Sequence, residues 1–184
     1  MCIRDSTEVA ISAACSVAAA ASRAVVAHSF DDIIAAALEG ASIGERLARE
    51  RARVVAGPSY LARLEMALAI ARDAKDDMAF MRQMERTVGN SVLAAESVPA
   101  AIGVLAYAKG DPLRTIAISA SIGNDTDSIA TMAGAIVGAW VGTEALPQAL
   151  LAEFRAANAA DFDLDALASG LSEIAWRNLQ PLAA

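Results

Sequence analysis

Residues 123–142 decide the fold class, and they read Gly-Asn-Asp-Thr-Asp-Ser-Ile-Ala-Thr-Met-Ala-Gly-Ala-Ile-Val-Gly-Ala-Trp-Val-Gly. A glycine-containing loop leads into an apolar segment in which small residues recur every four positions, at Ala130, Gly134, Gly138 and Gly142. Such a repeat lies on one face of an α-helix and lets another backbone approach closely. The segment falls short of the roughly 18–20 apolar residues of a membrane span. We therefore expect a central helix in a water-soluble bundle.

Helical periodicity and helix start and stop signals account for the rest of the chain, and no segment alternates as a strand does. Ser29, with Asp32 three positions later, has the form of a capping box, and Asp111-Pro112 combines a cap with a first-turn proline. We expect helices over residues 7–27, 29–40, 46–55, from 59, 77–89, 99–109, 111–119, 125–142, from 147, and 164–177. The predicted fold is a compact orthogonal all-α bundle, with residues 1–184 in one domain.

Composition narrows the possible partners. Of the 184 residues, 56% are hydrophobic and only 4% aromatic, so the core has to rely on close contact between helices. The net charge is −7, and no lysine or arginine cluster stands apart from acidic neighbours, which argues against nucleic acid or an acidic membrane as partner. The apolar N-terminal helix contains Glu8 and lacks a basic lead-in, so it does not resemble a secretory signal, and we expect a cytoplasmic protein.

The first six residues, Met-Cys-Ile-Arg-Asp-Ser, resemble the adaptor-derived sequence found at the ends of assembled metagenomic reading frames. We therefore expect residues 1–6 to be foreign to the natural protein. The chain is then an N-terminally truncated fragment of a longer one.

The junction between the loop and the apolar helix carries the chemistry. Asp125 lies at the expected N-cap, Ser128 follows three positions later on the same side, and Asp127 lies in the first turn. Three oxygen donors gathered there would suit a hard cation such as Mg²⁺, Mn²⁺ or Ca²⁺. Acidic residues at a helix start also serve as ordinary caps, so both interpretations stay open. Two aspartates exceed what one cap requires, and the helix that follows is too apolar for a surface position.

Several segments together resemble the C-terminal signature of the ADP-ribosylglycohydrolase family, which includes the dinitrogenase-reductase-activating glycohydrolase. They are Glu-Ser-Val-Pro-Ala-Ala-Ile at 96–102, residues 119–128, the helix at 129–139 and Leu146-Pro147. The likeness is specific over about residues 96–147. Upstream of residue 96 it is only compatible, as alanine-rich helices at plausible spacing.

The resemblance implies an all-helical fold with two Mg²⁺ ions in a cleft, and Mn²⁺ as a possible substitute. It assigns Asp125, Asp127 and Ser128 as metal ligands. The implied reaction is hydrolysis of the bond that links ADP-ribose to a protein side chain or a small molecule. The metals would orient the ribose hydroxyls and a water beside the anomeric carbon.

The chain departs from the family pattern at several places. Asn124 stands where the family usually has glycine. Asparagine can tolerate the same unusual backbone angle, and the resemblance makes Asn124 a candidate substrate-binding residue whose side chain would narrow the pocket. Ser128 replaces the commoner threonine and keeps the hydroxyl. The family's N-terminal Gly-Asp motif and its Thr/Ser-Asp-Asp motif, which supply the other ligands, do not occur upstream of the segment that resembles the family. We therefore expect this chain alone to be inactive.

Other acidic and aromatic residues have simpler interpretations. The aspartate pairs at 31–32 and 76–77 lie in the wrong context for ligands and read as helix caps. The acidic run 161–165 lacks the glycine and glutamate of a calcium loop and reads as a cap for the last helix. His28 is the only histidine, which excludes a multi-histidine zinc site. Trp140 and Trp176 are expected to anchor the core or an interface.

Two alternatives to an enzyme remain. A binding module would keep ADP-ribose or a metal without chemistry, and a structural protein would reuse the fold as crystallin-like relatives do. Intact Asp125 and Asp127 favour the enzyme or the binding module over the structural role. The sequence leaves the choice between these two open, because half of the expected site is absent from it.

Overall fold

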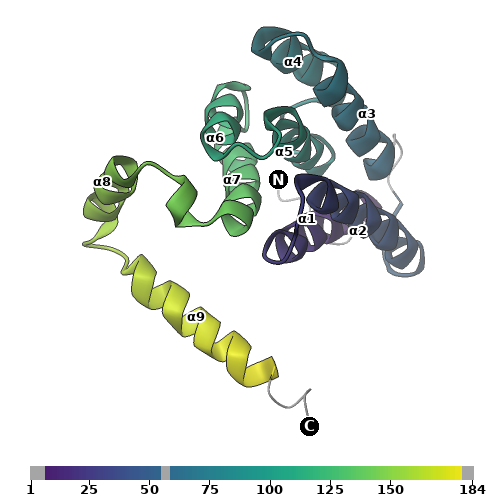
Figure 1. The fold of residues 1–184 in the computed structure, drawn as a ribbon. Helices are drawn as coiled ribbons and strands as arrows, with labels where there is room; N and C mark the ends of the chain where they lie inside the picture. Colours follow the sequence, from purple (N-terminus) through teal and green to yellow (C-terminus); the bar gives the residue numbers. More distant parts are fainter. Residues whose placement is uncertain (1–6, 55–58, 180–184) are drawn as a thin grey trace. The chain divides into compact units, whose positions relative to one another are not determined.

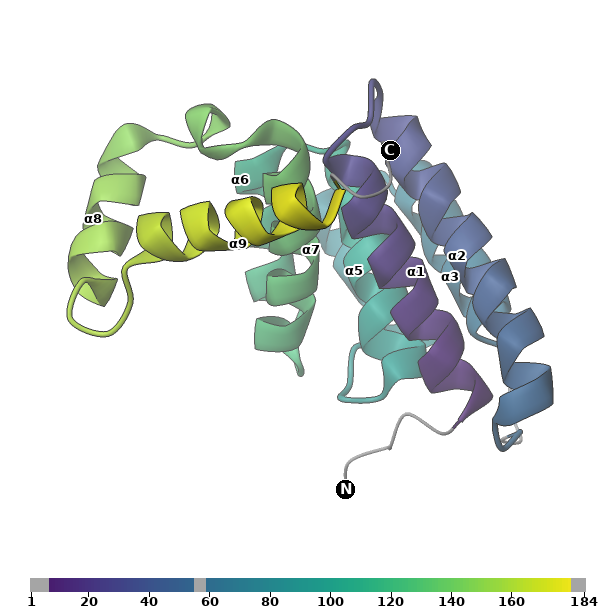
Figure 2. The same ribbon diagram turned by 90° about the horizontal axis from the view of Figure 1, so that it is seen from below.

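The computed structural model describes residues 7–54 and 59–179, which are predominantly helical (Figures 1 and 2). Within these ranges, a π-helical turn at Met84–Val88 continues the fourth helix, and a 3₁₀ turn at Thr143–Ala145 follows the seventh. The α-helices are α1 (Glu8–Ala24), α2 (Phe30–Arg51), α3 (Tyr60–Asp73), α4 (Asp77–Gln83), α5 (Ala94–Ala108), α6 (Pro112–Ser121), α7 (Thr126–Val141), α8 (Gln148–Asn158) and α9 (Leu164–Leu179). The expected all-α class is confirmed. The prediction about residues 1–6 lies outside the described residues.

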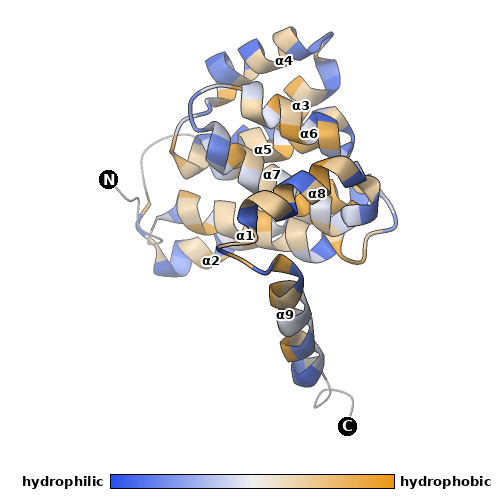
Figure 3. Ribbon diagram, turned by 90° about the vertical axis from the view of Figure 1, so that its left-hand side faces the viewer, coloured by the Kyte–Doolittle hydropathy of each residue, from blue (hydrophilic) through white to orange (hydrophobic). Residues whose placement is uncertain are grey.

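Contacts divide the chain into two units, Met1–Gly142 and Thr143–Ala184. Helices α1–α7 belong to the first unit, and all the buried residues of the described chain lie in this unit. In the second unit, α9 carries hydrophobic and hydrophilic residues along its length (Figure 3). That residues 1–184 form a single domain stays a prediction. None of the described helices is both long and apolar enough to cross a bilayer.

Helices α1 and α2 lie side by side in extensive contact (Figures 1 and 2). A Cβ atom added to Gly44 of α2 would lie 2.5 Å from the Cα of Ser12, and one added to Gly40 would overlap the backbone of Cys15. Glycine is required at both positions because the two backbones touch. The prediction of separate helices at 29–40 and 46–55 is therefore wrong: Gly40 marks a helix contact, and α2 continues to Arg51.

Helix α5 is the most buried helix, and it begins five residues before the expected start at Pro99. The carbonyl oxygen of Leu93 accepts hydrogen bonds from the amide of Ser97 at 2.9 Å and from its hydroxyl at 3.2 Å. These bonds complete a helical turn before the proline, so the missing N–H of Pro99 does not set the boundary. Helix α5 contacts both α3 and α7.

Helix α7 contacts α1, α5 and α6, as expected of a central helix. Its buried face consists of Ile129, Ala133, Ile136 and Val137, and none of these belongs to the small-residue repeat. Apart from chain neighbours and the nearby backbone of α7 itself, no described atom lies within 4 Å of a Cβ built on Gly134, Gly138 or Gly142. The prediction that the small residues form the packing face of α7 is therefore wrong. The close contact between helix backbones is made instead by Gly40 and Gly44 of α2 against α1.

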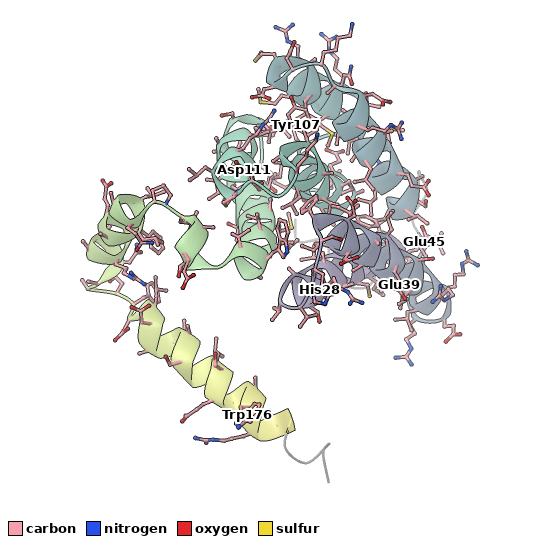
Figure 4. All side chains as sticks on the ribbon, in the orientation of Figure 1. His28, Glu39, Glu45, Tyr107, Asp111 and Trp176 are labelled. Atoms are coloured by element: carbon pink, nitrogen blue, oxygen red, sulfur yellow. The ribbon has the colours of Figure 1, made fainter. Side chains whose placement is uncertain are left out.

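Trp140 packs against Phe30 with ring centroids 5.6 Å apart, so it anchors α7 to α2 as expected. Trp176 lies exposed on α9 (Figure 4), and its role as an anchor stays a prediction.

A polar cluster joins α4, α5 and α6 at the surface. The carboxylate of Asp77 accepts hydrogen bonds from the Tyr107 hydroxyl and from Nη2 of Arg114, each at 2.8 Å. The Tyr107 ring stacks on Phe80 at 4.3 Å, and the Arg114 guanidinium lies 4.8 Å from its centroid. From its sequence context Asp77 was expected only at a helix start. In the structure Asp77 also connects three helices, because Tyr107 and Arg114 reach it from 30 and 37 positions away.

Two matched glycine substitutions test the packing. We expect Gly40→Ala to lower the free energy of unfolding by about 1–3 kcal/mol, because its Cβ would collide with α1. We expect Gly138→Ala to raise it by up to about 1 kcal/mol, because glycine weakens a helix interior and this position is open. Urea denaturation followed by circular dichroism measures both. Equal effects of the two changes would contradict this assignment of the helix contact.

The pKa of Asp77 is lowered, first by its hydrogen bond from Tyr107 and then by that from Arg114. We therefore expect Tyr107→Phe to raise the pKa of Asp77 toward its ordinary value. A depressed carboxyl pKa contributes stability that is present above the unfolded-state pKa of about 4 and is lost as the pH falls through the folded-state pKa. The variant should lose part of that contribution at neutral pH. NMR titration of the carboxyl carbons measures the shift, with Asp73, whose pKa is lowered by Arg72, as the unchanged control.

Candidate metal centre

Asp125 precedes the first turn of α7 at the N-cap position, but its side chain does not cap the helix. Its backbone angles are φ −82° and ψ 50°, away from the extended region that the side-chain-capped N-caps of α1, α2, α3, α4 and α6 adopt. In those helices the side-chain oxygen of the N-cap residue accepts a hydrogen bond, at 2.7–3.3 Å, from the amide three positions later; these N-cap residues are Thr7, Ser29, Ser59, Asp76 and Asp111. The simple capping interpretation of Asp125 is therefore wrong.

The Asp125 carboxylate is used differently. Its Oδ1 accepts a hydrogen bond from the Ser128 hydroxyl at 3.0 Å, so the expected convergence of these two side chains is confirmed. Asp127 lies exposed in the same turn. Across residues 7–54 and 59–179, no ion pair involves Asp125 or Asp127. Two carboxylates and a hydroxyl thus share one helix turn without a protein cation beside them.

The loop before α7 has an unusual backbone. Gly123 has φ +91° and Asn124 has φ +55°, so two successive residues lie in the left-handed region. Asparagine tolerates this region better than most residues, which confirms the expectation for Asn124. Asn124 is exposed, and its Nδ2 donates a hydrogen bond to Oδ1 of Asn90 at 3.0 Å.

Asn90 is the residue that the sequence analysis missed. It lies between α4 and α5 with only 3% of its surface exposed. Its Nδ2 donates to the carbonyl oxygen of Ile122 at 2.8 Å, and its backbone oxygen accepts from the amide of Asp125 at 3.1 Å. With the bond from Asn124, one buried residue holds three of the four residues that join α6 to α7. Asn90 lies 32–34 positions from the side-chain partners, so no local pattern could reveal it.

The segment around Asn90 is supported by a charged pair. Arg63 of α3 donates from Nη1 to the carbonyl oxygen of Val88 at 2.6 Å, and the same nitrogen lies 3.8 Å from Glu96. Glu96 of α5 also accepts the amide of Ser91 at 3.1 Å. Gly89 has φ +90°, and a Cβ there would collide with the Glu96 side chain. The residues on both sides of Asn90 are therefore fixed by α3 and α5.

The donor types fit a hard cation. Carboxylate and hydroxyl oxygens are the ligands that Mg²⁺ and Mn²⁺ take in proteins, and Asp125, Asp127 and Ser128 supply only these. The part of the chain that the structure describes contains no group of three or more histidine, cysteine, aspartate or glutamate residues able to hold a metal. The turn therefore fits one side of a metal site.

The other sequence candidates behave largely as expected. Asp32 completes the capping box with Ser29, and Asp163 accepts the amide of Ala166 at 2.9 Å at the start of α9. Asp165 pairs with Arg155 at 3.3 Å, so the acidic run 161–165 serves as a cap and a surface ion pair. His28 lies exposed in the loop between α1 and α2 (Figure 4).

Comparison with known proteins assigns the class. The model of the ADP-ribosylglycohydrolase family matches residues 3–179, and the chain belongs to this family.

Among individual relatives, the chain is 36% identical to the uncharacterized protein YegU of Escherichia coli (strain K12), over 157 residues that cover 85% of this chain and 46% of YegU. It is 45% identical to the ADP-ribosylhydrolase ARH3 of Homo sapiens over 71 residues, covering 33% of this chain and 20% of ARH3. The Bos taurus ARH3 is 40% identical over 84 residues, or 40% of this chain and 23% of ARH3. The chain thus spans about half the length of YegU, and its match covers a smaller part of the two ARH3 proteins. No solved structure matches it.

A matched pair of substitutions tests whether Asp125 caps α7. We expect Asp111→Ala to lower the free energy of unfolding by about 1 kcal/mol more than Asp125→Ala does, because only Asp111 holds an amide of its helix. Both changes remove one negative charge at a helix N-terminus, so the dipole contribution largely cancels in the comparison. Thermal and urea denaturation measure the difference. Equal losses would return Asp125 to a capping role.

Proposed function

We propose that Asp125, Asp127 and Ser128 form one side of a Mg²⁺ site, with Mn²⁺ as a substitute, in a hydrolase that cleaves the glycosidic bond of ADP-ribose. The bond would link ADP-ribose to a protein side chain or a small molecule. The observation that carries the proposal is the carboxylate of Asp125, which leaves the helix uncapped and pairs with Ser128. Family membership supports the reaction type.

The Asp125–Ser128 hydrogen bond suits metal binding. A serine hydroxyl has one donor hydrogen and two acceptor lone pairs, so donation to Asp125 leaves both lone pairs free for a cation. The same bond limits the orientations that the Asp125 carboxylate can take. Asp127 is exposed and can turn its oxygens toward the same ion.

To bind a cation, the negative charges of this turn must offset the partial positive charge at the N-terminus of α7. The N-terminus of an α-helix carries roughly half a positive charge, which disfavours a cation there. Two carboxylates in one turn would reverse the sign of the local field, and a bound cation would offset their repulsion. This explains why two acidic residues follow a loop where one cap would suffice.

A bound Mg²⁺ would stabilise developing negative charge and lower the pKa of its water. The chain's own part is to hold the ligand oxygens and to orient the sugar beside them. Asn124 is exposed next to the ligands, and its Nδ2 is engaged with Asn90. Among the described residues no hydrogen bond to its Oδ1 is formed, so this oxygen can accept a hydrogen bond from a ribose hydroxyl.

Asp125, Asp127 and Ser128 cannot complete the coordination of two Mg²⁺ ions, each of which takes about six oxygens. We therefore propose that the 184-residue chain alone binds Mg²⁺ weakly, in roughly the millimolar range, and does not turn over substrate. An assay of free ADP-ribose released from ADP-ribosylated protein tests this. Release that requires Mg²⁺ and stops with EDTA would contradict the proposal that the chain alone is inactive.

Asp127→Ala tests the metal ligands. We expect it to abolish Mg²⁺ binding measured by calorimetry while leaving the helical content unchanged, because Asp127 makes no ion pair within the described residues. Asp161→Ala, which removes another exposed aspartate, is the matched control and should bind as the unmodified chain does. Equal affinity of Asp127→Ala and the unmodified chain would exclude Asp127 as a ligand.

A further inference from the structure

The loop that carries the proposed ligands has little internal support. Gly123 and Asn124 both have positive φ angles, and Asp125 lacks the side-chain bond that usually fixes an N-cap. Left-handed angles at a residue other than glycine cost on the order of 1 kcal/mol, so such a loop needs external contacts to keep one conformation.

Asn90 provides those contacts. Its side chain binds Ile122 and Asn124, and its backbone oxygen binds the amide of Asp125. The three bonds thus reach the first residue of the loop, Ile122, as well as Asn124 and the proposed ligand Asp125. A buried carboxamide also has few alternative partners, since water does not compete for it.

The position of Asn90 is itself defined. Arg63 binds the carbonyl oxygen of Val88, and Glu96 binds the amide of Ser91. Hydrogen bonds therefore hold the chain on both sides of Asn90. The contact between Gly89 and Glu96 leaves no room for a side chain on Gly89. A rigid segment of this kind can transmit a defined geometry to the loop it contacts.

We infer that Asn90 is a positioning residue: it holds residues 122–125 in the geometry in which Asp125, Asp127 and Ser128 bind the metal. This inference rests on the proposed function. Asn90 acts through the ligand loop, and its hydrogen bond to Asp125 joins the two backbones and leaves the Asp125 carboxylate out.

The experiment uses NMR of the full chain with Mn²⁺ as the probe, because paramagnetic broadening detects weak binding at individual amides. We expect Mn²⁺ to broaden the amides of residues 125–128 first. In Asn90→Ala the Mn²⁺ concentration for half-broadening should rise by about 10-fold or more, the usual effect of removing a supporting contact behind a metal ligand. Hydrogen exchange at the Asp125 amide should accelerate, while exchange in α5 stays unchanged.

Asn124→Gly gives a second variant that does not disturb the core. It removes only the side-chain bond to Asn90 and keeps a residue that adopts positive φ readily. We expect a smaller rise in the half-broadening concentration than in Asn90→Ala. If part of the effect passes through this bond, Asn90→Ala should cost less in the Asn124→Gly background than in the unmodified chain.

Asn158→Ala in α8 is the matched control, because it also removes a carboxamide bonded to a backbone carbonyl, that of Phe154 at 2.8 Å. It should leave the broadening unchanged. Failure of Mn²⁺ to broaden residues 125–128 in the unmodified chain would contradict the proposed function and, with it, this inference. Selective broadening that neither Asn90→Ala nor Asn124→Gly alters would overturn the role of Asn90 alone.

Discussion

The hydrogen bonds of buried Asn90 are the constraint on which the candidate site depends. They join the segment between α4 and α5 to the loop between α6 and α7. Burial of a carboxamide is unfavourable unless its donor and acceptor are both used, and here Nδ2 and Oδ1 each have a partner. The two segments therefore cannot move apart without leaving buried polar groups unpaired. The backbone of Asp125 is fixed as part of the same arrangement.

Local rules predicted much of the helical structure from the sequence. Ser29, Ser59 and Asp111 cap their helices as expected. A cap involves residues only three positions apart, so the local sequence is enough to predict it. The same rules failed at Gly40. A glycine ends a helix in one context and permits a helix contact in another, and only the position of α1 distinguishes the two cases.

The candidate site could be predicted only in part. The spacing of Asp125 and Ser128 places them together on a helix, and the structure confirms their hydrogen bond. Asn90 and the Arg63–Glu96 pair could not be found in this way, because their partners lie 25 to 34 positions away and a single polar residue leaves no periodic signal. The open face of α7 was predicted wrongly although it carries a clear periodic signal. Its small-residue repeat resembles a packing surface, but no other helix packs on it among the described residues.

The departure of Asp125 from the pattern of the other caps connects stability with function. A carboxylate that binds helix amides has fewer lone pairs left for a metal, so the two roles compete for the same oxygens. Leaving α7 uncapped sacrifices about 1 kcal/mol of helix stability. The loss is tolerable because α7 is held by its buried face and by the loop that Asn90 fixes. Because tertiary contacts stabilise α7, the Asp125 carboxylate is not needed as a cap and remains available for the proposed metal at the start of the helix.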